Sequence, residues 1–151
     1  MIVYLVRHGE AKNPAEDPGR GLTPRGVKQV ESTARAALER GARPSAIFHS
    51  PKARAAETAG VLAARLNPPD KHEMTDGLAP NDDPREWAGR LQDMDEDVML
   101  VGHLPHLPGL VSLLLGTDGQ IENVTFQPAT MAALENTNDN IWKLLWTINP
   151  N

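Results

Sequence analysis

Residues 2–10 read IVYLVRHGE, and they place an arginine and a histidine where a short apolar run stops. The run Ile2–Val6 predicts a buried strand, because it is short, apolar and rich in β-branched residues. Arg7 and His8 follow at the end of that strand. A cation and an imidazole beside a hydrophobic core are costly without a partner, so we expect them to hold a ligand.

Apolar runs and helical patterns alternate along the rest of the chain, which predicts an α/β fold with three α/β/α layers and a mostly parallel central sheet. Further strands are expected at Ser45–His49, weakly at His72–Thr75, at Val98–Val101, and in a closing hairpin of Met131–Leu134 and Ile141–Trp146. Helices are expected from Pro24 to Gly41, from Ser50-Pro51 to about Leu66, after Asp83-Pro84, and over Leu107–Leu114.

Three cap signals mark where these helices begin. Thr23-Pro24 and Ser50-Pro51 each combine a capping hydroxyl with proline at the first helical position. Asp83 precedes Pro84, and Glu86 stands three residues after Asp83, as in a capping box.

Composition limits the classes of protein to consider. The chain has 151 residues, 40% of them hydrophobic, a formal net charge of −5 and no cysteine. We therefore expect one domain over residues 1–151, no disulfide or thiolate zinc site, and no broad surface for nucleic acid or an anionic membrane. No signal peptide or membrane span is apparent, so we expect a cytoplasmic protein.

Basic and imidazole side chains follow several of the predicted strands. Arg7 and His8 follow the first, Arg54 lies in the first turn of the second helix, and His103 follows Val98–Val101. Ligands collect beyond the carboxyl ends of parallel strands, where helix N-termini also point. Two guanidinium groups and two imidazoles gathered there would suit a phosphoryl group. His106 lies three residues beyond His103, but no further ligand follows at metal-binding spacing, so no metal site is expected.

The sequence resembles the histidine phosphatase superfamily, which has the phosphoglycerate-mutase-like fold. Four blocks carry the resemblance in order: LVRHGE (5–10), LTPRG (22–26), HSP with RA and ETA (49–51, 54–55 and 57–59) and VGH (101–103). The resemblance implies that His8 is the nucleophile, that Arg7, Arg54 and His103 hold the phosphoryl oxygens, and that no metal or other cofactor is needed. Neutral imidazole, with an ordinary pKa of ~6.5, suits the nucleophile's role.

Three other residues are weaker candidates. The short SixA-type phosphohistidine phosphatases, which the chain resembles most in length and block layout, carry an arginine at the place of Arg20, which implies a further phosphate or substrate contact. Glu10 either orients the site or is only a loop residue without a role in the site. Among Asp76, Asp82 and Asp83, Asp83 is explained by helix capping, and Asp82 is left as the candidate general acid.

The substrate expected from this resemblance is phosphohistidine on a signalling or phosphotransfer protein, with inorganic phosphate as product. A phosphorylated imidazole releases a leaving group whose conjugate acid has a pKa of only ~6.5, so a strong general acid is less necessary than for an alkoxide. The short chain also leaves no room for helices that wall off a small-molecule pocket. A small-molecule phosphomonoesterase of the same fold is the first alternative, and a non-catalytic phosphoprotein-binding module is the second.

Overall fold

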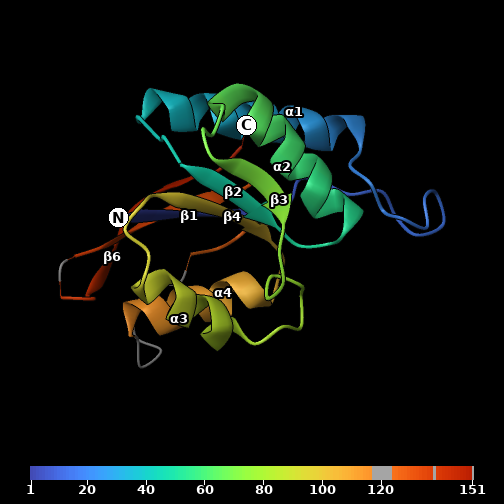
Figure 1. Cartoon of the computed structure of the whole chain (residues 1–151). Helices are drawn as coiled ribbons and strands as arrows, with labels where there is room; N and C mark the ends of the chain where they lie inside the picture. The colour runs from blue at the N-terminus through green and yellow to red at the C-terminus, as the bar shows by residue number, and fades with distance from the viewer. Residues whose placement is uncertain (117–123, 138, 151) are drawn as a thin grey trace.

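The computed structural model describes residues 1–116, 124–137 and 139–150, in which four helices and six strands are found (Figure 1). The strands are β1 (Ile2–Arg7), β2 (Ala46–His49), β3 (Lys71–Met74), β4 (Val98–Gly102), β5 (Met131–Asn136) and β6 (Trp142–Ile148). The helices are α1 (Pro24–Glu39), α2 (Ala53–Leu66), α3 (Pro84–Gln92) and α4 (His106–Leu115). Each expected element is present, and the ends differ by a few residues.

The strands form one mixed sheet in the order β3-β2-β4-β1-β5-β6. The first four in this order are parallel neighbours, while β5 is antiparallel to both β1 and β6. This confirms the expected sheet, mostly parallel and closed by a C-terminal hairpin.

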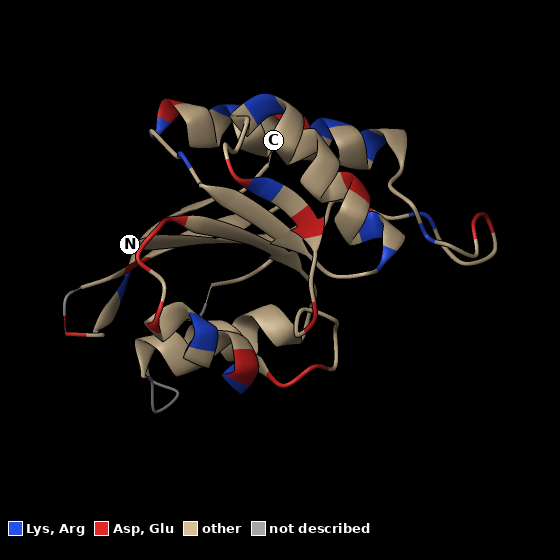
Figure 2. Ribbon diagram, viewed as in Figure 1, with Lys and Arg blue, Asp and Glu red and all other residues tan. Residues whose placement is uncertain are grey.

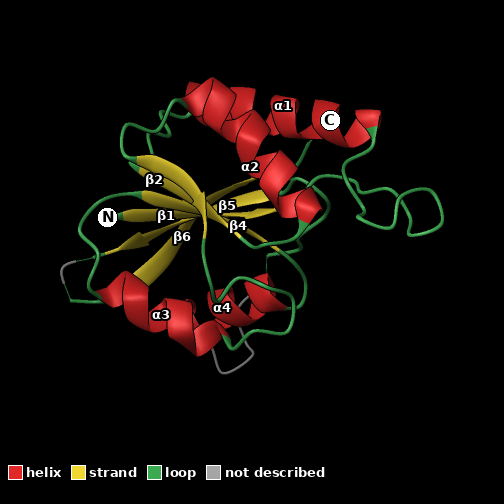
Figure 3. Cartoon of the chain, turned by 45° about the vertical axis from the view of Figure 1, so that its right-hand side comes forward, coloured by secondary structure: helices red, strands yellow, loops and turns green. Residues whose placement is uncertain are grey.

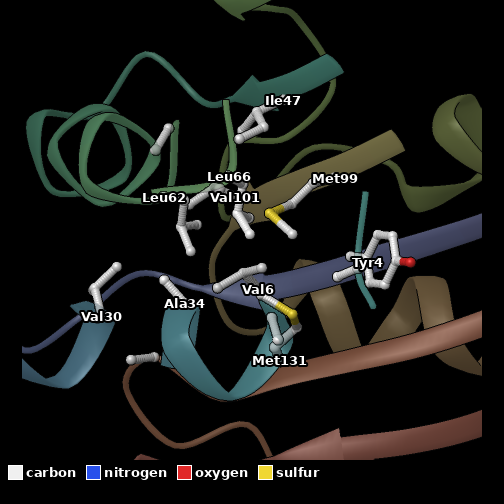
Figure 4. Close-up of a cluster of buried hydrophobic side chains, with 14 of the residues drawn as sticks. Tyr4, Val6, Val30, Ala34, Ile47, Leu62, Leu66, Met99, Val101 and Met131 are labelled. Carbon is white, nitrogen blue, oxygen red and sulfur yellow. The ribbon is translucent and has the colours of Figure 1, made fainter. Parts of the chain in front are cut away.

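Two helical layers cover this sheet (Figures 1 and 3). Alternate residues of a strand face opposite sides, so β1 sends Tyr4 and Val6 toward α1 and α2, and Val3 and Leu5 toward α3 and α4. Figure 4 shows the first of these two apolar clusters, in which Val6 and Val101 meet Val30 of α1 and Leu62 of α2. The three-layer α/β/α architecture is therefore confirmed. In the described parts of the chain, no helix combines the length and apolar character needed to cross a bilayer.

The caps of two helices agree with the sequence. Thr23 Oγ1 accepts a hydrogen bond from the Gly26 N–H at 2.9 Å and so caps α1. Asp83 accepts one from the Arg85 N–H at 3.0 Å and caps α3. The expected return bond of the capping box is absent in this described segment, because the Glu86 carboxylate instead accepts a hydrogen bond from Arg90 at 2.9 Å.

The prediction that Ser50 caps α2 is wrong. The cap residue is Lys52, which makes no side-chain capping bond, and the helix begins at Ala53. The hydroxyl of Ser50 lies instead 2.6 Å from an imidazole nitrogen of His103, a residue 53 positions away in the sequence. Sequence spacing could not reveal this contact, because it depends on β2 and β4 being neighbours.

The parallel strands β1 and β4 pair side by side, with Arg7 opposite Gly102 at their carboxyl ends. The chain leaves β1 toward α1 in one helical layer and leaves β4 toward α4 in the other. Adjacent strands whose connections diverge in this way open a crevice at the edge of the sheet, which is where ligands bind in α/β folds. Arg7, His8 and His103 all lie at this edge.

Candidate active site

His8 and His103 face each other across the carboxyl ends of β1 and β4. The His8 N–H donates a hydrogen bond to the Gly102 carbonyl at 3.1 Å, which ties the two strand ends together. The centroids of the two imidazole rings are 5.1 Å apart. The structure therefore brings together two residues that are 95 positions apart in the sequence.

One nitrogen of the His8 ring is held by the backbone. Nδ1 lies 2.7 Å from the Gly9 carbonyl oxygen, which only accepts, so Nδ1 carries the proton and Nε2 keeps its lone pair. The ring is 8% exposed. Burial, reinforced by the charges of Arg54, Arg7 and Arg20, lowers the pKa of His8 to about 4, although the Gly9 hydrogen bond opposes the shift. The imidazole is neutral at pH 7 and can act as a nucleophile through Nε2.

His103 is also buried and neutral. It is 2% exposed, and burial lowers its pKa to about 3, with smaller contributions from His8, Arg54 and Lys52. Its Nε2 lies 2.6 Å from the Oγ of the buried Ser50. When Ser50 donates to Nε2, the proton of the ring is on Nδ1, which makes that atom a hydrogen-bond donor.

The guanidinium groups of Arg7 and Arg54 lie near His8, since both charges lower its pKa. The Nη1 of Arg7 donates to the Phe126 carbonyl at 2.8 Å, which fixes the side chain against the segment that leads into β5. Burial lowers the pKa of both arginines, yet arginine stays charged at any physiological pH. Within the described residues, Arg7 Nε, Arg54 Nε and His103 Nδ1 are buried polar atoms without a hydrogen-bond partner.

Thr58 connects the loop after β1 to the start of α2, a role that the sequence analysis missed. Its Oγ1 accepts a hydrogen bond from the Gly9 N–H at 3.0 Å and donates one to the Arg54 carbonyl at 2.7 Å. Thr58 is fully buried and stands one helical turn after Arg54. That i, i+4 spacing was the available signal, because it places both side chains on one face of the helix.

Arg20 is presented to the site by a tight turn. Asp17 accepts hydrogen bonds from the Gly19 and Gly21 N–H groups, both at 3.0 Å, and Arg20 has a positive φ of 53°. The Arg20 Nε donates to the Lys12 carbonyl at 3.2 Å. The charge of Arg20 lowers the pKa of His8 and of Arg54, so this side chain lies near both.

Glu10 points toward the beginning of α1. Its Oε1 accepts a hydrogen bond from Thr23 Oγ1 at 3.2 Å, and its Oε2 lies 3.5 Å from Arg25 Nε. Its backbone N–H donates to Gln29 Oε1 at 3.0 Å. These contacts fasten the loop after His8 to α1.

Asp82 is engaged in a turn. Its Oδ2 accepts a hydrogen bond from the Ala79 N–H at 2.9 Å. Its charge raises the pKa of His106, a residue that is 2% exposed. The charges that change the pKa of His8 are instead those of arginines, which lower it. Among the described residues, no three histidine, aspartate or glutamate side chains gather closely enough to hold a metal ion.

Taken together, Arg7, Arg54, His8 and His103 are suited to hold a tetrahedral oxyanion. The guanidinium groups and the His103 ring can donate hydrogen bonds to oxygens that gain negative charge, and the lone pair of His8 is available to attack the central atom. Burial strengthens each of these interactions, because little water competes for the donors.

Comparisons with known proteins agree with this geometry. A sequence model of the histidine phosphatase superfamily (branch 1) matches residues 3–89, more than half of the chain. An uncharacterized protein of Picosynechococcus is 33% identical over 114 residues, covering 71% of this chain and 68% of that protein.

Solved structures share the fold over nearly the whole chain. The protein histidine phosphatase SixA complexed with tungstate has a TM-score of 0.88 at 24% identity, covering 99% of this chain and 97% of that one. A structure described as a phosphohistidine phosphatase SixA of Agrobacterium tumefaciens has a TM-score of 0.79 at 27% identity, with the same coverage. A phosphoserine phosphatase mutant of Entamoeba histolytica, in complex with phosphoserine, also shares the fold, with a TM-score of 0.72 at 14% identity and 97% and 95% coverage.

Proposed function

The chain belongs to the histidine phosphatase superfamily, and from this membership we propose that it removes phosphate from phosphohistidine on a signalling or phosphotransfer protein. The observation that carries the proposal is the neutral, backbone-anchored His8 beside three buried donor atoms that lack a partner among the described residues. Members of this superfamily are phosphatases, and the structural likeness to SixA favours phosphohistidine as the substrate.

The proposed reaction has two displacements at phosphorus. In the first, His8 Nε2 forms a bond to phosphorus while the bond from phosphorus to the substrate imidazole breaks, and the imidazole leaves as a neutral ring that keeps the proton on its other nitrogen. In the second, water attacks the phosphoryl group on His8, the bond to Nε2 breaks, and inorganic phosphate leaves with a proton released to solvent. Splitting the transfer in this way gives two easier steps, and neither step calls for a metal ion.

Arg7, Arg54 and His103 stabilise the transferred group in both steps. The charge of a phosphoryl group in transfer is spread over its three equatorial oxygens, so several fixed donors are more effective than one. Arg20 adds a further contact to the phosphate or to the substrate. Loss of one such donor typically costs about 10²-fold or more in rate.

The leaving group decides between substrate classes. When the other ring nitrogen of the substrate is protonated, neutral imidazole departs, and because its conjugate acid has a pKa of ~6.5 no strong general acid is needed, whereas an alkoxide needs a proton from the enzyme. The Asp82 carboxylate accepts a hydrogen bond from the Ala79 N–H, and its charge raises the pKa of His106. Because Asp82 is engaged in these contacts, the site favours phosphohistidine, the substrate that needs no strong general acid. Asp82 is the residue we propose as proton donor if the enzyme cleaves esters.

The test compares substrates and traps the intermediate. A histidine-phosphotransfer domain phosphorylated with phosphoramidate is offered beside phosphoserine, a sugar phosphate and a nucleotide, and kcat/KM is measured for each. We expect the phosphorylated domain to be the best substrate, and faster turnover of a monoester would overturn the substrate assignment. Rapid denaturation at alkaline pH, where phosphohistidine survives, is expected to trap ³²P on wild-type protein and none on His8→Ala.

A phosphomonoesterase remains the second candidate, because a phosphoserine phosphatase has the same fold. It predicts that Asp82 is essential for ester cleavage. A phosphoprotein-binding module without activity is the third candidate, and label trapped on His8 would reject it.

A further inference from the structure

Charge is distributed very unevenly between two parts of the chain. Residues 1–66, which include α1 and α2, carry 11 lysines and arginines against six acidic residues. Residues 70–97, which include α3, carry three lysines and arginines against ten acidic residues. The part of the chain that holds α1 and α2 is therefore cationic although the protein as a whole is acidic, and Figure 2 shows basic segments along α1.

The basic side chains of α1 fall along one side of the helix. Arg25, Lys28 and Arg35 are exposed and stand three and seven residues apart, spacings that return to the same face. At 1.5 Å per residue, the row from Arg25 to Arg35 is about 15 Å long. A row of this length matches about three turns of a helix in a docked protein.

Two cations of this row, Lys28 and Arg35, have no counter-ion among the residues that the structure describes. The carboxylates nearest the row are already paired, Glu10 with Arg25 at 3.5 Å and Glu31 with Arg65 of α2 at 2.6 Å. Within the described ranges, no carboxylate oxygen lies within 4 Å of the charged group of Lys28 or Arg35. Their charge is therefore available to a partner.

The surface beside this row is hollowed. A cavity of about 310 Å³ is lined by Arg25, Lys28, Gln29, Gln127, Pro128 and Pro150. A second cavity of about 230 Å³ is lined by Lys28, Glu31, Ser32 and Arg35. The two cavities adjoin at Lys28, and we call them together the α1 groove.

The α1 groove begins next to the active site. Gln29 accepts a hydrogen bond from the Glu10 N–H, two residues beyond His8. At the other wall, Ala129, which follows Pro128, donates its N–H to the carbonyls of Arg7 and His8 at 3.1 and 3.0 Å. Both walls of the α1 groove are therefore bonded to the segment of residues 7–10 that carries His8.

We propose that the α1 groove docks an acidic surface of the phosphohistidine-bearing substrate protein, with Lys28 and Arg35 as its anchors. The inference rests on the proposed function and adds how a protein substrate is selected. Complementary charge steers encounter and excludes partners of the wrong sign. A nucleic acid or a membrane fits less well, because the row is short and the acidic part of the chain would be repelled by either.

The test uses the double variant Lys28→Glu/Arg35→Glu and a control of equal charge change, Lys71→Glu/Lys143→Glu. Lys71 begins β3, and Lys143 pairs with Glu135, which lies opposite Ile2. Both control positions thus lie at the end of the sheet where β1 begins, away from His8, which follows the other end of β1. Each protein is assayed with an acidic histidine-phosphotransfer domain phosphorylated with phosphoramidate, and with free phosphohistidine.

We expect the groove variant to lose at least about tenfold in kcat/KM for the domain, mostly through KM, relative to its kcat/KM for free phosphohistidine. The loss is expected to shrink at high salt. The control keeps the wild-type ratio, and Lys28→Ala/Arg35→Ala shows a smaller loss in the same direction, which separates charge from misfolding.

Three outcomes would overturn the inference, and they are distinguishable. If wild-type protein dephosphorylates the domain and the groove variant does so equally well, docking at α1 is wrong while the proposed function stands. If wild-type protein cleaves monoesters but not the domain, the proposed function fails and the docking inference falls with it. Weaker binding of the groove variant to duplex DNA, with unchanged turnover of the domain, would assign the row to nucleic acid instead.

Discussion

The Nδ1 atom of His8 lies 2.7 Å from the carbonyl oxygen of Gly9, the next residue in the chain. This contact determines which ring nitrogen is free to react. The loop cannot move away, because the Gly9 N–H donates to the buried Thr58 Oγ1. The proposed nucleophile is thus oriented by its own backbone neighbour.

The first prediction concerns the protonation of His8. Because burial and three arginines lower its pKa to about 4, the ring is expected to stay neutral, with the proton on Nδ1, from pH 7 down to about pH 5. The unfolded chain binds protons near pH 6.5, so the contribution of His8 to stability is lost as the pH falls from 6.5 toward 4. ¹⁵N NMR of the imidazole, with His8→Ala for assignment, measures the midpoint. A midpoint near 6.5 would contradict the expected environment.

The second prediction concerns the hydrogen bond between Ser50 and His103. Ser50→Ala removes the hydroxyl that lies 2.6 Å from Nε2, so the ring loses its fixed tautomer and orientation. We expect kcat to fall about tenfold, equivalent to about 1.4 kcal/mol, with little change in thermal stability. Ser45→Ala is the control, because the hydrogen bonds that Ser45 makes within the described residues come from its backbone. Equal kcat in the two variants would remove Ser50 from the site.

The Ser50 contact also shows what the sequence could and could not predict. Strands, helices and the gathering of Arg7, His8 and His103 follow from local patterns, because parallel strands place their carboxyl ends together. The partner of a particular side chain does not follow from such patterns. Ser50 matched a helix cap by local rules, and only the pairing of β2 with β4 brings its hydroxyl to His103.

The α1 groove was beyond sequence analysis for a related reason. Its walls come from α1 and from residues 127–128, which are about 100 positions apart and meet through the pairing of β1 with β5. The roles of Thr58 and Asp17 likewise depend on backbone groups of neighbouring loops. Helical spacing places Thr58 on the same face as Arg54, but it does not reveal the bond from Gly9 to Thr58 or the turn around Asp17.

The third prediction tests how Arg20 is held. Arg20→Ala is expected to lower kcat/KM about 10- to 100-fold, because a cation near the phosphoryl group is lost. Asp17→Ala breaks the turn formed by the Gly19 and Gly21 N–H groups and is expected to give a smaller loss in the same direction. The double variant should be no slower than Arg20→Ala, since Asp17 acts through Arg20. Glu16→Ala, a neighbouring exposed change, serves as the control, and additive losses would show that Asp17 acts independently.

The fourth prediction concerns the close packing of Gly26. A Cβ at this position would lie 2.2 Å from the backbone oxygen of Glu10, so Gly26→Ala must push the loop after His8 away from α1. We expect a loss of about 2 kcal/mol or more in stability, together with lower activity. Gly89→Ala, in the open interior of α3, is the matched control and is expected to gain about 0.5–1 kcal/mol. Equal effects in denaturant unfolding would mean that the loop yields easily.

The last prediction separates the two phosphatase candidates through Asp82. If phosphohistidine is the substrate, Asp82→Asn should leave kcat within about threefold, because imidazole departs without a strong acid. The asparagine keeps an oxygen that can accept the Ala79 N–H, so the turn is expected to persist. An ester phosphatase that uses Asp82 as its acid would lose about 10²- to 10⁴-fold in the same variant. Measuring kcat for phosphohistidine and for phosphoserine in wild type and Asp82→Asn distinguishes the two, since only the ester reaction makes the carboxyl proton essential.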